Sequence, residues 1–177
     1  MPETLAPWLV ESAMKDRQTI TARWTPAEQR LIDGVQVREV LNVPKSNGYL
    51  TEIFRAEWFG LNAVVDQVFQ VVLEPGAISA WHAHADTTDR LFVASGTARI
   101  ALFDARPDSP TARQVNDFRF GTIRPALVTV PAGVFHGVQN CGSTPMTLIN
   151  IVDRAYDYED PDHWRVTYPS NEIPFRF

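Results

Sequence analysis

The chain has 177 residues, of which 45% are hydrophobic and 21% are charged, as in an ordinary globular domain. The net charge of -5 argues against a nucleic-acid-binding surface, and the single cysteine, Cys141, excludes an internal disulfide framework. The segment from Met1 to Val10 lacks the features of a signal peptide, and no apolar run approaches the roughly 20 residues of a membrane span. We therefore expect a single cytoplasmic domain.

The N-terminal part of the chain carries one helix signal. Thr25-Pro26-Ala27-Glu28 has the pattern of a capping box with proline at the first helical position, and Gly34 can end a helix. This pattern predicts a short helix over residues 26–33, within an N-terminal arm of residues 1–34.

After Val35 the pattern changes to β-strands. Short segments rich in β-branched and aromatic residues alternate with turn signals such as Ser46-Asn47-Gly48 and Glu74-Pro75-Gly76. The predicted strands cover residues 35–43, 49–54, 67–73, 91–94, 98–103, 127–130 and 147–152. Many strands without intervening helices are typical of a sandwich, jelly roll or barrel, so we expect an all-β barrel over residues 35–156. We expect the aromatic residues 157–177 to form an irregular extension packed on the barrel or on a partner subunit.

Three of the four histidines have a spacing typical of a metal site. His82 and His84 are two residues apart, so on a strand both imidazoles point to the same face. Asp89 follows after a polar turn that can bring its carboxylate back, and His136 comes from a distant strand. Three imidazoles and a carboxylate leave positions open on a metal ion for catalysis. We therefore predict one divalent ion (Fe, Mn, Ni, Co or Zn) on these four residues, with Asp86 as the alternative carboxylate.

Two segments resemble the motifs of the cupin superfamily. The first is the series Gly76, His82, His84, Asp89 and Gly96, with Asp where Glu is usual, and residues 131–140 match the core of the second motif. The resemblance implies a double-stranded β-helix, the jelly-roll barrel of the cupins, with a metal ion in its mouth. It also implies a homodimer, because cupins of this shape commonly pair through sheet edges.

Residues 33–177 further resemble the dTDP-4-dehydrorhamnose 3,5-epimerase family of cupins, through residues 48–54, 104–111, 130–137 and 156–177. The resemblance places the family's substrate-binding glutamine on Gln67 and its general base on His82. At the positions of the family's lysine, acid tyrosine, orienting aspartate and two arginines, the chain carries residues of other chemistry: Asp89, Ile149 or Asn150, Thr167 or Tyr168, Ser79 and Asn47.

These replacements suggest that a metal ion takes over the lysine's role as the group that stabilises an enolate. A metal-bound histidine cannot act as a base, because its lone pair is occupied. We therefore expect the general base among three residues: Glu52, Tyr49 and His163. We expect substrate contacts from four residues, of which the two phenylalanines can equally be core residues: Gln67, Phe69, Phe92 and Asn140.

Three functions remain open at this point. The preferred one is a metal-dependent enzyme that isomerises or epimerises a carbohydrate or nucleotide-sugar by metal-assisted enolisation. The second is an Fe(II)-dependent oxygenase, because three histidines and a carboxylate also suit iron and oxygen. The third is a non-enzymatic sugar-binding cupin, because the proton-transfer groups of the family are replaced.

Overall fold

The computed structural model describes residues 8–24, 27, 29–60 and 64–177. The chain divides into two compact units, residues 1–30 and 31–177. The described residues of the first unit form turns and extended chain without a helix. Within all the described residues, no helix is long and apolar enough to cross a membrane.

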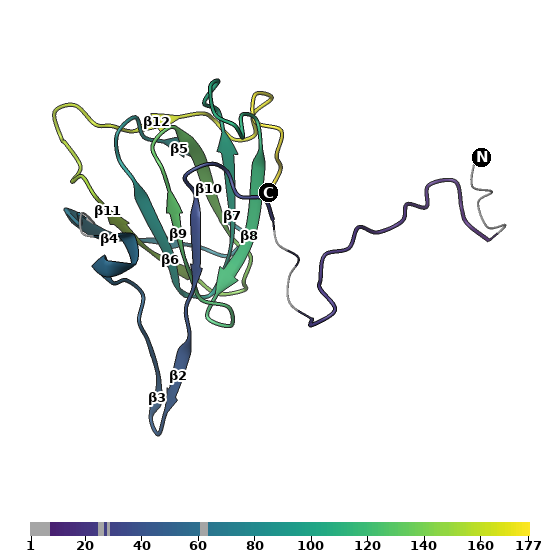
Figure 1. Ribbon diagram of the computed structural model, residues 1–177, viewed down its shortest axis with the longest axis horizontal. Helices are drawn as coiled ribbons and strands as arrows, with labels where there is room; N and C mark the ends of the chain where they lie inside the picture. Colours follow the sequence, from purple (N-terminus) through teal and green to yellow (C-terminus); the bar gives the residue numbers. More distant parts are fainter. Residues whose placement is uncertain (1–7, 25–26, 28, 61–63) are drawn as a thin grey trace. The chain divides into compact units, whose positions relative to one another are not determined.

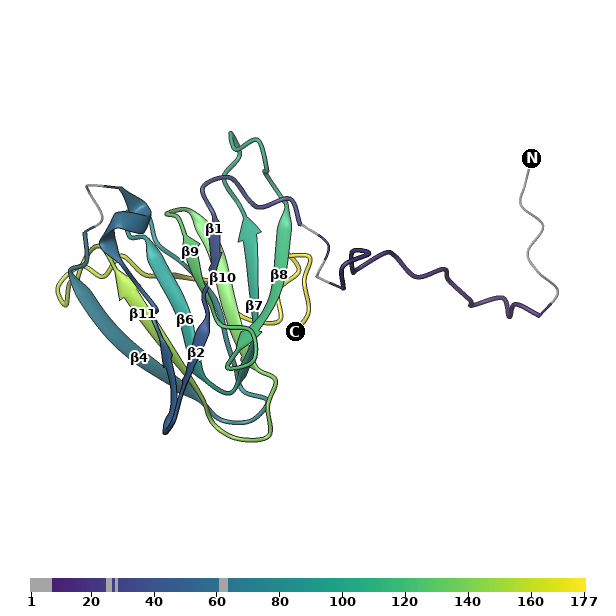
Figure 2. The ribbon, with the colours of Figure 1, turned by 60° about the horizontal axis from the view of Figure 1, so that its bottom comes forward.

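Residues 31–177 form two five-stranded antiparallel sheets that face each other across a shared core (Figures 1 and 2). The first sheet has the order β1 (Gln36–Glu39), β9 (Ala126–Val130), β6 (Asp89–Ser95), β11 (Met146–Val152) and β4 (Gln67–Leu73). The second has the order β12 (Trp164–Arg165), β5 (Ile78–Ala83), β10 (Val134–Asn140), β7 (Thr97–Asp104) and β8 (Val115–Gly121). This arrangement confirms the predicted all-β jelly-roll barrel of the cupin type.

A two-stranded hairpin stands apart from both sheets. Strands β2 (Asn42–Lys45) and β3 (Gly48–Thr51) pair only with each other and extend from one end of the barrel (Figure 1). A 3-10 turn, η1 (Ala56–Phe59), leads from this hairpin back toward β4.

The core follows from the two-residue period of the strands. Alternate side chains of β6 and β9 face inward and meet those of β7 and β8. Among the largest fully buried core side chains are Leu91, Val128, Ile100, Leu102 and Phe120. Each such side chain stabilises the fold by roughly 1.5–3 kcal/mol relative to an exposed position.

The C-terminal segment covers the outer face of the second sheet. Trp81 on β5 is 0% exposed, and its ring centroid lies 5.9 Å from that of Phe175 and 5.4 Å from that of Phe177. Since neighbouring residues on a strand face opposite sides, the burial of Trp81 under the segment turns His82 toward the inside of the barrel. The last residues of this segment therefore pack on the outside of the barrel. Its earlier part, near Trp164, reaches the mouth of the barrel.

The helix expected over residues 26–33 is not formed where the structure can be described. Thr25, Pro26 and Glu28 lie outside the described residues, and residues 29–33 are not helical. The backbone N–H of Ile32 donates to Asn116 Oδ1 at 2.9 Å, and that of Asp33 donates to Thr111 Oγ1 at 2.8 Å. These donors bind barrel side chains instead of a preceding helical turn, so tertiary contacts outweigh the local helix signal.

Candidate active site

A cavity of about 570 Å³ lies between the two sheets. Its walls come from β4, β6 and β11 of the first sheet and from β5 and β10 of the second. Residues 154–157 and 160–164 border it on the side of the C-terminal segment. Apolar side chains such as Phe69 and Leu91 alternate with a small number of polar groups, which is the usual character of a small-molecule site.

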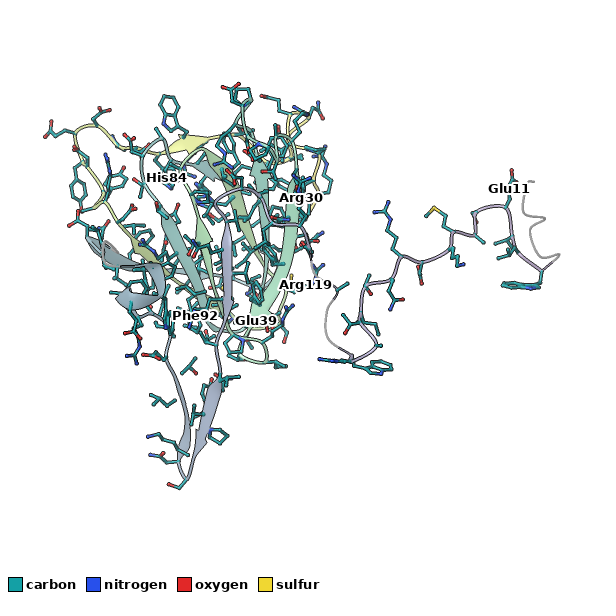
Figure 3. All side chains as sticks on the ribbon, viewed as in Figure 1. Glu11, Arg30, Glu39, His84, Phe92 and Arg119 are labelled. Atoms are coloured by element: carbon teal, nitrogen blue, oxygen red, sulfur yellow. The ribbon has the colours of Figure 1, made fainter. Side chains whose placement is uncertain are left out.

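All four histidines of the chain meet in this cavity. His82 on β5 lies opposite His136 on β10 in the strand register, and their ring centroids are 5.9 Å apart. His84 follows two residues after His82 and also lines the cavity, with its ring centroid 5.6 Å from that of His136. Figure 3 shows His84 near the upper end of the barrel. His163 lies just before β12, and its ring centroid is 4.9 Å from that of His82 and 5.1 Å from that of His84.

Asp89 is the buried carboxylate of this cluster. It begins β6 and is only 2% exposed. Asn150 on β11 donates to its Oδ1 at 2.5 Å, while its Oδ2 lies 3.2 Å from His84 Nε2 and 3.7 Å from His136 Nε2. A carboxylate this deep needs such donors, because burial without partners is unfavourable.

The hydrogen bonds of His84 show where its proton lies. Its Nδ1 contacts the backbone carbonyl of Asp162, and a carbonyl can only accept, so Nδ1 carries a proton. In this tautomer Nε2 carries the lone pair, and it faces Asp89 Oδ2 at 3.2 Å.

His82 and His163 form a second pair with different electrostatics. His82 Nδ1 and His163 Nε2 are 2.7 Å apart, and His82 Nε2 is 3.0 Å from Ser79 Oγ. Burial, followed by the charges of His136 and Arg165, lowers the pKa of His82 to about 3. Burial also lowers the pKa of His163 and, against the opposing effect of Asp89, that of His136. These three imidazoles are therefore neutral at pH 7.

The three residues expected to include the base lie in different places. His163 lines the cavity. Tyr49 lies on β3 of the separate hairpin and is exposed. Glu52 follows β3, is half exposed and pairs with Arg55. Neither Tyr49 nor Glu52 lines the cavity of its own chain.

The four expected substrate-binding residues also divide into two groups. Gln67 and Phe69, at the start of β4, line the cavity. Phe92 is 5% exposed and faces the outer side of β6, opposite to its cavity-lining neighbour Leu91. Asn140 is 1% exposed at the far end of β10, where it donates to the carbonyls of Leu73 and Thr144.

Comparison with known proteins places the chain in a family. Residues 45–164 match the family described as the polysaccharide biosynthesis C-terminal domain. The chain belongs to this family. It is 31% identical over 138 residues to a protein named a probable low-salt glycan biosynthesis epimerase of Haloferax volcanii, covering 77% of this chain and 88% of that one. It is 31% identical over 152 residues to a spore coat polysaccharide biosynthesis protein of Bacillus subtilis, covering 83% of this chain and 97% of the relative.

The chain shares its fold with solved dTDP-sugar enzymes. A dTDP sugar isomerase from Desulfovibrio desulfuricans superposes with a TM-score of 0.76 at 23% identity, covering 82% of this chain and 91% of that chain. The resemblance to the epimerase fold that the sequence indicated is thereby confirmed.

The predicted divalent metal cofactor is wrong. Solved proteins that share this fold include dTDP-sugar epimerases and isomerases, a class that acts without a metal cofactor. The geometry of the donors also departs from the expected four-residue set. Among the described residues, His84, Asp89 and His136 bring one donor atom each to within 4.8 Å of one another. His82 is outside this group; its ring nitrogens lie 3.0 Å from Ser79 Oγ and 2.7 Å from His163 Nε2.

Proposed function

We propose that this chain epimerises or isomerises a nucleotide-linked keto-sugar, by removing a proton next to the carbonyl group and returning one. The observation that supports this most is the pairing of two different histidine environments in one cavity. In one pair, His82 and His163 are neutral imidazoles in hydrogen-bond contact; in the other, His84 Nε2 faces the buried carboxylate of Asp89 at 3.2 Å, where we place the acidic proton of the reaction. Groups whose environments separate their protonation states are the usual acid and base of such reactions.

His82 is the proposed base. Resemblance to the epimerase family places the general base on this residue, and the neutral imidazole lines the cavity. When it takes a proton from the substrate, its hydrogen bond to His163 at 2.7 Å spreads the positive charge over two rings.

The His84–Asp89 pair is the proposed acid. His84 lies on the same cavity wall as His82, and Asp89 faces it from the other sheet; a proton shared between them would replace the one that the family's tyrosine supplies. Donation of that proton to the carbonyl oxygen neutralises the negative charge that develops during enolisation.

Two observations support a nucleotide-linked substrate: the likeness to solved dTDP-sugar enzymes and one cation at the rim of the cavity. The solved protein with TM-score 0.76 is a dTDP sugar isomerase. Arg154 is the one Arg or Lys among the described residues that line the cavity, and it is exposed and 3.6 Å from Asp86. A diphosphate at the cavity mouth would exchange this weak surface ion pair for a charge-assisted contact with Arg154.

The test is deuterium exchange. The purified protein is incubated in D2O with a dTDP-linked 4-keto-6-deoxy sugar, and mass spectrometry follows the uptake of deuterium next to the carbonyl. We expect exchange that persists after treatment with EDTA and falls about 10²- to 10⁴-fold in His82→Asn. Thermal stabilisation by the sugar without any exchange would instead indicate a sugar-binding protein.

We further propose that the chain works as a homodimer. The hairpin β2–β3 exposes apolar side chains, and so does the edge strand β4; they are Val43, Tyr49 and Leu50 on the hairpin and Val68 and Val72 on β4. Exposed apolar patches of this kind mark protein interfaces. Light scattering coupled to gel filtration is expected to give the mass of two chains, and a monomer at micromolar concentration would contradict the proposal.

A further inference from the structure

The turn between β5 and β6 carries a candidate acid residue at each of its ends. His84 stands immediately before it and Asp89 immediately after it. The turn itself, residues 85–88, is short and partly exposed, and it contributes no strand pairing. Its conformation therefore decides how far His84 Nε2 lies from Asp89 Oδ2.

Two carboxylates, Asp153 just after β11 and Asp162 in the C-terminal segment, accept from all four backbone N–H groups of this turn. Asp162 accepts from the N–H groups of Ala85, Asp86 and Thr87, at 2.6, 2.9 and 3.0 Å. It also accepts from the Thr87 hydroxyl at 3.0 Å, while Asp153 accepts from the N–H of Thr88 at 2.8 Å.

Asp162 contacts the site through its backbone as well. Its carbonyl accepts from His84 Nδ1, which leaves His84 Nε2 pointing at Asp89. The next residue, His163, bonds to His82. One dipeptide of the C-terminal segment thus fixes both histidines at the end of β5.

We infer that Asp162 is a positioning residue, which sets the tautomer of His84 and its distance from Asp89 by anchoring the 85–87 turn. The consequence for catalysis rests on the proposed function, whereas the anchoring itself does not. Burial alone would raise the pKa of Asp162, but the N–H groups of the turn and the Thr87 hydroxyl outweigh it and hold this pKa at about 2. The carboxylate of Asp162 therefore stays ionised at and around neutral pH.

The first experiment needs no substrate. The ¹⁵N signals of an imidazole distinguish a nitrogen that carries a proton from one that does not, and with four histidines in the chain a His84→Gln variant assigns the His84 signals. We expect Nδ1–H at His84 in the wild type. We expect a mixture of tautomers in Asp162→Ala and in Asp162→Asn, which places an amide NH2 against N–H donors.

The matched control is Glu159→Gln, which removes the same charge from the same segment. Glu159 is exposed and does not line the cavity. This variant is expected to keep the wild-type spectrum. Asp162→Asn keeps the shape of the side chain and decides the question if Asp162→Ala does not fold.

The second experiment measures kcat and KM separately with the keto-sugar. Since a misplacement of about 1 Å costs on the order of 100-fold in rate, we expect kcat to fall roughly 10- to 100-fold in both Asp162 variants, with KM within about threefold. An unchanged His84 tautomer in both folded variants, or an equal change in Glu159→Gln, overturns the inference. If no keto-sugar reacts even with the wild type, the proposed function fails while the ¹⁵N spectra still decide the role of Asp162.

Discussion

Replacement of Asp89 by asparagine separates the chemical role of this residue from its structural role. In Asp89→Asn the carbonyl oxygen still accepts from Asn150, and the new amide can donate to His84 Nε2, which lies 3.2 Å from the original carboxylate oxygen. The hydrogen bond from Asn150 is retained, but the neutral amide removes the carboxylate on which the proposed acid depends. We therefore expect a free energy of unfolding within about 1 kcal/mol of the wild type and a loss of exchange activity of about 10²- to 10⁴-fold.

Asp89→Ala gives the contrasting result. It leaves the buried amide of Asn150 without its acceptor, and an unsatisfied buried donor costs about 1–3 kcal/mol. Urea denaturation measures both stabilities, deuterium exchange measures both activities, and Asp108→Asn on an exposed turn controls for the loss of charge. The reasoning is refuted if Asp89→Asn keeps more than about a third of the wild-type activity, or if it destabilises the fold as much as Asp89→Ala.

Two further predictions concern stability. Gly137→Ala would place a Cβ 2.5 Å from Ala80 Cβ and 2.9 Å from Phe177 Cζ, so we expect urea denaturation to show a loss of about 1–3 kcal/mol; an unchanged midpoint would contradict this. The free energy of unfolding should fall as the pH is lowered from 7 to 4.5, because His82 has a pKa of about 3 in the folded protein against 6.5 in the unfolded chain, and the unfolded chain therefore binds more protons. The lowered pKa values of His136 and His163 act in the same direction. The variant His82→Gln should make the free energy of unfolding depend less on pH. A stability that rises on acidification would be inconsistent with neutral histidines.

The barrel could be predicted from the sequence because its strongest strands are apolar and bounded by turn residues. The segment of residues 67–73 coincides with β4, and residues 91–94 and 98–103 lie within β6 and β7. Four strands lie outside the predicted strand ranges: β5, β8, β10 and β12. The first three carry polar residues such as His82, Asp117 and Gln139. They are strands because neighbouring strands pair with them, on both sides for β5 and β10 and through β7 alone for β8.

The candidate site was predictable as far as strand periodicity reaches. The two-residue spacing puts His82 and His84 on one cavity wall. Along β6 the side chains alternate between the two faces of the sheet, so Leu91 faces the cavity with Asp89 and Phe92 faces the opposite side. The position of Phe92 could therefore have been predicted from the sequence. No local pattern joins His163 to His82, 81 residues apart, or Asp162 to the turn at residues 85–87.

The position of Asp89 links three replacements that look like separate losses when the chain is compared with the epimerases residue by residue. A carboxylate in place of the lysine would be unfavourable alone, because negative charge there opposes an enolate. In the structure Asn150, which stands near the position of the acid tyrosine, donates to one oxygen of Asp89, and His84 faces the other. The proton that we propose between His84 and Asp89 would balance the carboxylate and be available to the substrate. Replacement of Asp89 by lysine alone should therefore abolish activity, since it would place a cation against His84 and leave Asn150 without its acceptor.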